Sequence, residues 1–143
     1  MESRSLILSN KSEELEQLRM FIEELGRDWS LQASLVFELN LILEEYITNL
    51  VNYGYHDKDK HEISIEMIKE EAQLKIIVTD DAGPFNIMET PENKEIDKPV
   101  EDRRIGGLGI HFIRTLAEEI VYKSEGGLNK LTFLLQDGGQ SDG

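Results

Sequence analysis

The stretch LNLILEEYITNLVNYGY, residues 39–55, carries the clearest structural pattern of this sequence. Its apolar residues recur at helical spacing and form one broad stripe, which predicts a helix packed against a core. The members of the stripe are Leu39, Ile42, Leu43, Ile47, Leu50 and Val51. Glu45 and Asn49 stand four residues apart, so a helix places both side chains on one face, one turn apart.

Glu45 and Asn49 lie at the edge of this apolar stripe, where polar groups are costly unless they interact with something. A carboxylate in that position can accept a proton. An amide oxygen is a neutral, hard ligand that suits a magnesium ion. The alternative is a helix edge at which two polar groups simply meet solvent, and this stretch alone leaves both interpretations open.

Length and charge narrow the possible classes of protein. The chain has 143 residues, 39% of them hydrophobic, which suits one domain over residues 1–136 and a polar, flexible tail over 137–143. The formal net charge of −14 disfavours direct binding to nucleic acid or to an anionic membrane. The absence of cysteine excludes disulfides and thiolate chemistry. No apolar run approaches the roughly 20 residues of a membrane span, and the N-terminus lacks a signal-peptide layout, so we expect a soluble cytoplasmic protein.

Hydrophobic periodicity predicts three helices and five strands in irregular alternation. The helices are expected near residues 12–26, 31–53 and 110–119, and the strands near 5–9, 63–67, 74–78, 121–124 and 130–135. Ser12 is expected to cap the first helix, and Gly26 to lie near its end. Because helices and strands do not alternate one for one, the pattern predicts an α+β two-layer sandwich rather than a doubly wound fold. Its sheet is expected to be mixed and mostly antiparallel, with the helices on one face.

Some further residues have ordinary structural interpretations. Phe21, Trp29 and Phe37 are expected in the core. His56 and His61 flank a charged turn and are interpreted as solvated side chains.

Two more segments carry candidate binding chemistry. Asp80 ends an apolar strand and is followed by a tight turn, where its carboxylate can accept a hydrogen bond from an amine such as that of adenine. The run Gly106-Gly107-Leu108-Gly109 opens the third helix, where glycine lets the backbone approach a phosphate and free N–H groups attract anions. Residues 82–105 between them have no regular period, which is typical of a lid or binding loop. The alternatives are plain turn chemistry and a disordered insertion.

In combination, three stretches resemble the motifs of the GHKL, or Bergerat-fold, ATPases. They are EEYITNLVNYGY (44–55), VTDDAGPFN (78–86) and RRIGGLGIHFIRTLAEEI (103–120), and within that superfamily they are most similar to RsbW-like anti-sigma factor serine/threonine kinases. The resemblance covers nearly the whole chain and implies a histidine kinase-like ATPase domain with ATP and Mg²⁺ as cofactors and an ATP lid over residues 82–105. The chain departs from the usual Asp-x-Gly-x-Gly motif, since Ala82 and Pro84 occupy the two glycine positions.

The resemblance also implies a role for individual residues. Glu45 corresponds to the general base and Asn49 to the magnesium ligand, whereas Asp80 corresponds to the aspartate that reads adenine. Arg104, or its neighbour Arg103, would reach the terminal phosphate. The full set of implied nucleotide-binding residues is Asn49, Asp80, Ala82, Gly83, Ile105, Gly106, Gly107, Leu108 and Gly109.

The function implied by the resemblance is regulatory. An RsbW-like protein phosphorylates an anti-anti-sigma (STAS) protein and holds a sigma factor inactive, and a homodimer is possible. Two alternatives stay open at this point. One is a binding module that uses ATP to sequester a partner without phosphoryl transfer, and the other is a simple hydrolase in which Glu45 activates water.

Overall fold

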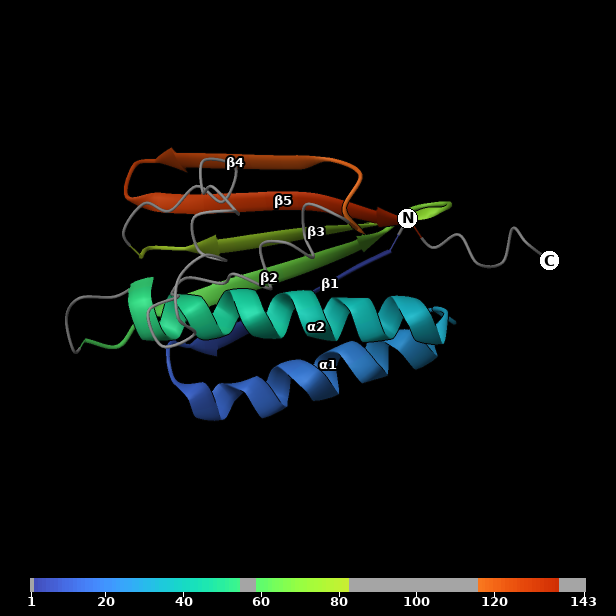
Figure 1. Ribbon diagram of the computed structural model, residues 1–143, viewed down its shortest axis with the longest axis horizontal. Helices are drawn as coiled ribbons and strands as arrows, with labels where there is room; N and C mark the ends of the chain where they lie inside the picture. The colour runs from blue at the N-terminus through green and yellow to red at the C-terminus, as the bar shows by residue number, and fades with distance from the viewer. Residues whose placement is uncertain (1, 55–58, 83–115, 137–143) are drawn as a thin grey trace, which may run out of the picture.

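A computed structural model describes residues 2–54, 59–82 and 116–136 of the chain (Figure 1). The elements follow one another as β1 (Glu2–Ser9), η1 (Ser12–Glu14), α1 (Leu15–Asp28), α2 (Ala33–Asn49), η2 (Leu50–Gly54), β2 (Glu62–Lys69), β3 (Gln73–Asp80), β4 (Ile120–Glu125) and β5 (Leu128–Gln136). The described part of the chain contains no helix that is long and apolar enough to cross a membrane.

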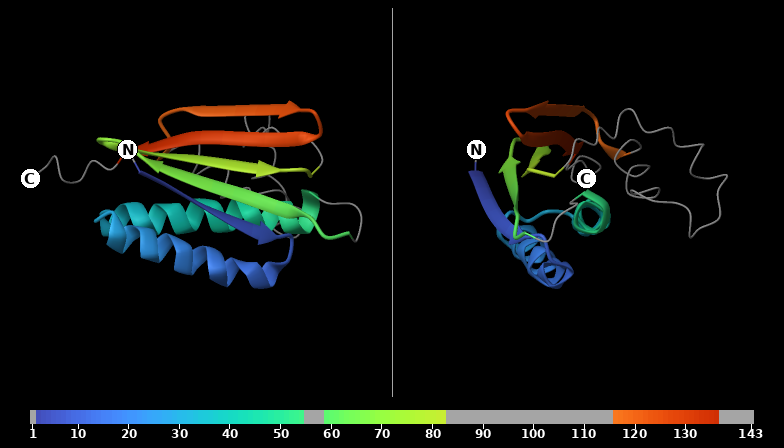
Figure 2. Two further views of the ribbon diagram at one scale, coloured as in Figure 1. Left: turned by 180° about the vertical axis from the view of Figure 1, so that it is seen from behind. Right: turned by 90° about the vertical axis from the view of Figure 1, so that its left-hand side faces the viewer.

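The five strands form one sheet in the order β1-β2-β3-β5-β4, and each pairing in it is antiparallel. Both α1 and α2 pack on the same face of this sheet (Figure 2). The predicted two-layer α+β architecture with helices on one face is therefore confirmed.

The core lies between the helices and the sheet. Along β3, buried and half-buried side chains alternate, so that Leu74, Ile76, Val78 and Asp80 all face the helices. The predicted stripe of α2 faces them and is buried, except that Val51 is half-buried. Burying one such aliphatic side chain stabilises the fold by about 1.5–3 kcal/mol, so the apolar residues of β3 must face the helices. Because Asp80 follows them at the same spacing of two residues, its side chain lies on that face as well.

The junction between α1 and α2 differs in detail from the prediction. Ser12 makes no capping hydrogen bond, whereas Gly26 lies near the end of α1, at Asp28, as predicted. A Cβ at Gly26 would lie 2.8 Å from Cγ2 of Val36, so glycine allows the two helices to approach closely. The Leu31 N–H donates to the Gly26 carbonyl at 2.9 Å, so Leu31 closes α1 and α2 begins two residues later than predicted.

The residue before this closing bond offers a test of the backbone geometry. Ser30 has a φ of 53°, the left-handed conformation in which a side chain costs about 1 kcal/mol. We expect Ser30→Gly to raise the free energy of unfolding by about 0.5–1 kcal/mol, measured by urea denaturation. Ser30→Ala is the matched control, because it keeps the Cβ, and it should give no gain. Equal stabilities of the two variants would contradict this account.

Two further expectations are corrected by the structure. Phe37 is 66% exposed, because it lies on the side of α2 turned away from the sheet, whereas Trp29 is buried as expected and Phe21 is half-buried. The third helix mostly lies outside the described residues, but it ends at Leu116 and not near Glu119. The Glu118 N–H and the Glu119 carbonyl bond to the backbone of Leu134 in β5, so the chain has left the helix, and Ile120 begins β4.

Candidate functional site

The candidate site lies at the end of the molecule where β3 finishes. The C-terminal end of α2, the η2 turn and the β4–β5 hairpin lie at the same end (Figure 1). Gly126 and Gly127 form that hairpin turn with φ values of 64° and 84°, as the predicted hairpin requires. The antiparallel register then sets Asn129 of β5 directly opposite Asp80 of β3.

Asp80 accepts two hydrogen bonds at one of its oxygens. Its side chain is 2% exposed, and Oδ1 accepts from the Ala82 N–H and from Asn129 Nδ2, both at 2.9 Å. Asn129 Nδ2 also donates to the Ala82 carbonyl at 2.7 Å, which closes the turn. Among the described residues no donor reaches Oδ2 of Asp80, so this oxygen can accept a hydrogen bond from a ligand.

Burial has an electrostatic cost at this position. Desolvation raises the pKa of Asp80 above its ordinary value, and the nearby charge of Asp81 raises it further. The hydrogen bonds from Asn129 and from the Ala82 backbone lower the pKa, but they do not cancel the effect of burial. The protein therefore keeps a carboxylate where an uncharged group would be easier to bury, which is typical of functional sites.

Asn129 is the site residue that the sequence reasoning missed. It is 3% exposed, and it occupies the first buried position of the alternating β5 pattern, followed by Leu131, Phe133 and Leu135. An amide at a core position of an otherwise apolar strand was the available signal. The role of Asn129 as a hydrogen-bond donor to Asp80 becomes visible only from the strand register, which sets the two residues opposite each other.

Glu45 and Asn49 lie on α2, both half-buried, as the helical spacing predicted. Neither side chain forms a hydrogen bond or ion pair with another residue in the described ranges. Directly after Asn49 the helix widens into the π-helical turn η2, a rare conformation found mostly at functional sites. These two polar groups lie at the end of the molecule that also holds Asp80. Contact with a ligand explains their position better than a structural hydrogen-bond network does.

The departure from the usual glycine motif does not distort the turn. Ser30 is the one non-glycine residue with positive φ among the residues described, so Ala82 has a backbone conformation open to any side chain. Ala82 is also buried, which shows that its methyl group has room. The described part of the motif therefore does not require a glycine at position 82.

His61 is not simply solvated, as the sequence suggested. Its Nδ1 lies 3.1 Å from both carboxylate oxygens of Asp81, and its backbone N–H donates to Asn10 Oδ1 at 2.9 Å. These contacts anchor the residue that follows Asp80. His56, by contrast, lies outside the described residues.

The remaining predicted site residues lie outside the described ranges. They are Gly83, Arg103, Arg104, Ile105, Gly106, Gly107, Leu108 and Gly109, together with the predicted lid beyond Ala82. Over residues 2–54, 59–82 and 116–136, no group of three His, Asp or Glu side chains is arranged to hold a metal ion. Asn49 would therefore hold a magnesium ion only together with other ligands, such as phosphate oxygens.

Comparisons of the sequence show which known proteins this chain resembles. Residues 8–135 match the sequence profile of the histidine kinase-like ATPase domain. The chain is 33% identical over 94 residues to the serine-protein kinase RsbW of Listeria monocytogenes. This alignment covers 62% of this chain and 59% of that protein. It is 29% identical over 94 residues to RsbW of Bacillus velezensis, covering 64% and 59% of the two chains. The chain thus spans about three fifths of the length of the curated relatives it matches.

Solved structures share the fold at lower sequence identity. The RsbU and RsbW domains of a Mycobacterium tuberculosis protein superpose with a TM-score of 0.62 at 11% identity, covering 95% of this chain and 32% of that one. A blue-light activated histidine kinase of Erythrobacter litoralis superposes with a TM-score of 0.56 at 14% identity, covering 78% and 33%. Both similarities agree with the antiparallel sheet and one-sided helical layer described above.

Proposed function

The chain belongs to the histidine kinase-like ATPase domain family, and we propose that it binds Mg-ATP and transfers the γ-phosphoryl group to a serine or threonine of a protein partner. The observation that carries the proposal is the Asp80 carboxylate. It is buried, held through Oδ1, and has no described donor at Oδ2. Such an oxygen is suited to accept a hydrogen bond from the exocyclic amine of adenine.

The second part of the proposal concerns the reacting groups. Glu45 is half-buried, and no described hydrogen bond or ion pair occupies its carboxylate. In the proposed reaction the partner's hydroxyl oxygen forms a bond to the γ-phosphorus while the bond to the β–γ bridging oxygen breaks, and ADP leaves. Glu45 accepts the hydroxyl proton, a task for a positioned carboxylate.

Asn49 is proposed to hold the magnesium ion together with phosphate oxygens. Its amide lies one helical turn beyond Glu45 and is not engaged by any described residue. A bound magnesium ion would supply positive charge beside the phosphates. Arg104, or Arg103, and the segment Ile105–Gly109 are proposed to contact the phosphates, and residues 82–105 to form the lid.

The proposed partners are suggested by the names of the relatives. The curated relatives described above are named serine-protein kinase RsbW, so we propose a STAS-type anti-anti-sigma protein as substrate and a sigma factor as the sequestered partner. A protein partner also suits the formal charge of −14, which disfavours nucleic acid and anionic membranes.

A direct assay tests the proposed activity. The chain is mixed with Mg-ATP and candidate STAS proteins, and the products are examined by mass spectrometry for an added phosphate on serine or threonine. Phosphate on a STAS protein supports the kinase. ATP that binds but stays uncleaved with every partner would contradict phosphoryl transfer and favour the binding module. Rapid ATP turnover without a partner would favour the hydrolase.

Asn129 allows a test of how a hydrogen bond to Asp80 affects the pKa of that residue and the binding of ATP. Asn129→Ala removes the side-chain bond that lowers the pKa of Asp80, so that pKa should rise further. If ATP binds to the ionised carboxylate, its affinity should fall by about tenfold in the pH range where Asp80 titrates, and the pH midpoint of binding should move upward. Calorimetric titration of ATP at several pH values measures both effects.

The control for this variant lies across the same hairpin. Ser124 is the exposed register partner of Asn129 in β4, so Ser124→Ala should leave ATP binding unchanged. If Asn129 served only to hold the shape of the turn, affinity would fall without any shift of the pH midpoint. That outcome would remove from Asn129 the proposed effect on the pKa of Asp80.

A further inference from the structure

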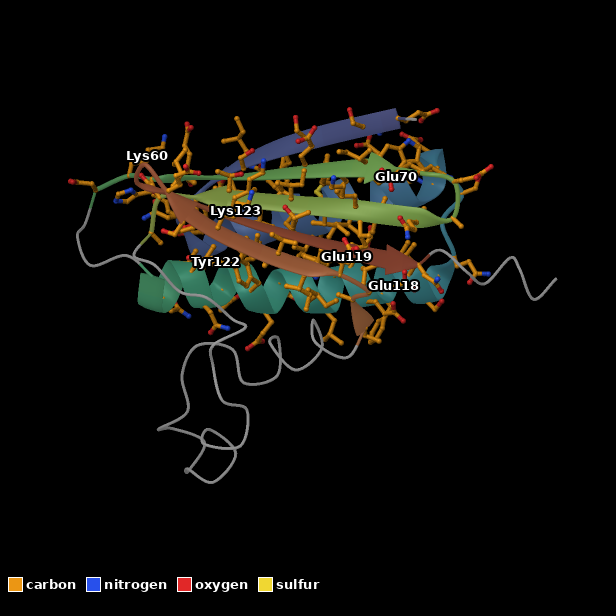
Figure 3. All side chains as sticks on the ribbon, turned by 90° about the horizontal axis from the view of Figure 1, so that it is seen from above. Lys60, Glu70, Glu118, Glu119, Tyr122 and Lys123 are labelled. Atoms are coloured by element: carbon orange, nitrogen blue, oxygen red, sulfur yellow. The ribbon has the colours of Figure 1, made fainter. Side chains whose placement is uncertain are left out.

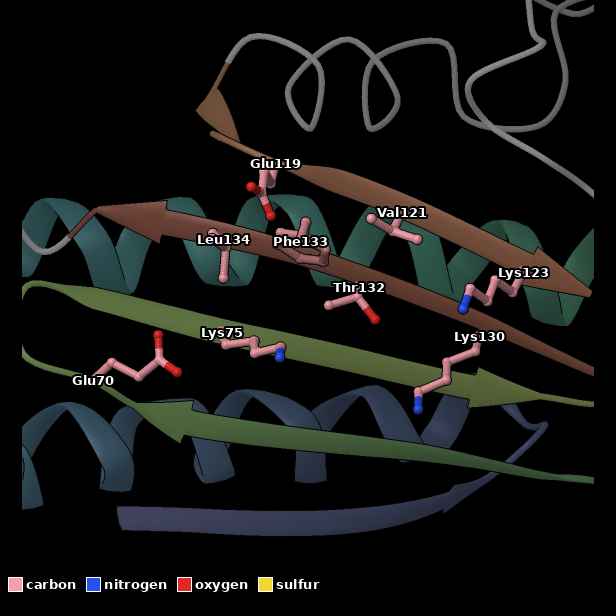
Figure 4. A pocket seen from close by; sticks show the side chains of 9 residues that line it. All are labelled: Glu70, Lys75, Glu119, Val121, Lys123, Lys130, Thr132, Phe133 and Leu134. Atoms are coloured by element: carbon pink, nitrogen blue, oxygen red, sulfur yellow. The ribbon is translucent and has the colours of Figure 1, made fainter. Parts of the chain in front are cut away.

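The face of the sheet turned away from α1 and α2 carries a cavity of about 300 Å³ over β3, β5 and β4 (Figure 4). Three lysines line it, one from each of these strands: Lys75 on β3, Lys130 on β5 and Lys123 on β4. The chain has 15 basic against 29 acidic residues, so a cavity lined by three cations differs from the charge of the chain as a whole.

These three ammonium groups lack a counter-charge in the described part of the chain. Over residues 2–54, 59–82 and 116–136, none of them forms an ion pair or a hydrogen bond. Lys75 is half-buried, where a cation without a partner is costly. Lys123 and Lys130 are register partners, and like charges directly opposite one another destabilise a sheet. Charges that cost stability in this way are expected where they bind something.

The carboxylates that line the same cavity lie at its other end. Glu70 and Glu119 are both separated from Lys123 by the length of the cavity (Figure 4), and the view from above shows the same separation (Figure 3). The side chain of Lys75 extends away from Glu70 and toward the other two lysines (Figure 4). The basic end of the cavity is therefore left to an anion that comes from outside the described residues.

The groups on this face suit the carboxylates of a protein segment better than a free phosphate. Phosphate sites commonly use free backbone N–H groups or the fork of an arginine. Here β5 is an inner strand whose backbone pairs with β3 on one side and β4 on the other, and no arginine lines the cavity. The cavity instead combines separate lysines with Val121, which is 45% exposed and provides an apolar contact for side-chain stems.

The spacing of the lysines fits an extended segment. Lys75 stands opposite Leu134, which lies four residues from Lys130 along β5. Four residues of a strand span about 13 Å. In an extended segment, side chains two residues apart point to the same side, so three carboxylates at alternate positions cover the same length.

We propose that the face over Lys75, Lys123 and Lys130 is a docking surface for an extended acidic segment of a different protein, with aspartate or glutamate at alternate positions. The carboxylates of that segment supply the counter-charge that the three lysines lack. The inference does not rest on ATP binding or phosphoryl transfer, because the contact lies on the face of β3 opposite to the Asp80 side chain.

A labelled acidic peptide tests the docking surface in the full-length chain without nucleotide. The probe is an acetylated seven-residue peptide in which glutamate at the second, fourth and sixth positions alternates with alanine. Binding is measured by fluorescence anisotropy at low ionic strength. A chain of formal charge −14 repels such a peptide over most of its surface, so binding requires a local basic site. The peptide should bind, more weakly as salt is added, and its glutamine analogue should not.

Substitution of the lysines locates the contact. The triple variant Lys75→Gln, Lys123→Gln and Lys130→Gln should bind the acidic peptide about tenfold more weakly or worse, and Lys75→Gln alone a few fold more weakly. Lys11→Gln is the matched control, because it makes the same charge change at an exposed position outside the cavity, and it should bind normally. Circular dichroism melting curves should show every variant folded, since the substitutions remove a repulsion.

Four results would overturn the proposal. The first is an unmodified chain that does not bind the acidic peptide at low ionic strength. The second is equal binding of the acidic peptide and its glutamine analogue, and the third is equal binding by the triple variant and the unmodified chain. The fourth is a chain that ignores the peptide but loses self-association in the triple variant, which would assign the face to a second copy.

Discussion

Asp80→Asn should lower the affinity for ATP by about 100-fold or more while the fold stays intact. The asparagine keeps an oxygen that can accept from Ala82 and Asn129, so the turn retains its bonds. Its amide nitrogen then takes the place of Oδ2 and presents a donor to the donating amine of adenine. Losing a hydrogen bond to a charged group and leaving a donor unpaired together account for this loss. Calorimetric titration with Mg-ATP measures it.

The same substitution should not cost stability at neutral pH. Since burial raises the pKa of Asp80 in the folded state, the ionised carboxylate opposes folding. Its favourable contribution is fully present below the unfolded pKa and is lost as the pH rises through the raised folded pKa. Asp80→Asn removes this dependence, so at pH 7 the variant should melt at the same temperature as the parent or higher, and the difference should shrink in acid.

Asp81→Asn is the matched control for Asp80→Asn. Asp81 is exposed and contacts His61, so its loss should change ATP affinity by only a few fold. Equal losses of affinity in the two variants would show that general negative charge, and not the Asp80 contact, governs binding. An Asp80→Asn protein that binds ATP normally would remove Asp80 from the site.

Glu45→Ala should reduce phosphoryl transfer to a partner by about 10²–10⁴-fold, the usual contribution of a general base. Binding of Mg-ATP should stay within a few fold of the unmodified chain, because the proposed role of Glu45 lies at the attacking hydroxyl. Single-turnover transfer, followed by mass spectrometry of the partner, separates this chemical step from binding.

The neighbouring residue supplies the control for Glu45. Glu44 is exposed on α2, so Glu44→Ala changes the same charge on the same helix without altering the half-buried position. It should transfer phosphate at the normal rate. If Glu45→Ala transferred phosphate as fast as Glu44→Ala, Glu45 would have no role as base.

The sequence predicts the elements of this fold well, because their periodicities are long and regular. The α2 stripe and the alternation of β3 together determine which faces meet, and the structure confirms both. The helix ends were harder to predict. Gly26 lies near the end of α1 as predicted, but its position also allows the close approach of Val36, a contact that depends on tertiary packing.

The candidate site was predictable only where a local motif carried it. Glu45, Asn49 and Asp80 stand in recognisable local patterns, whereas Asn129 lies 49 residues from its partner. That pairing depends on the β3–β5 register, which local sequence patterns do not specify. The pairing of His61 with Asp81 depends in the same way on the β2–β3 register, so it was missed as well.

Amide NMR spectra recorded during titration with Mg-ATP test the central claim most directly, namely that three distant segments form one nucleotide site. The account predicts that signals of residues 45–49, 80–82 and 105–109, together with Asn129, shift along one saturable curve. Residues of the opposite sheet face, such as Lys75 and Thr132, should stay unchanged. A spectrum without saturable shifts, or with shifts confined to other parts of the chain, would contradict the account.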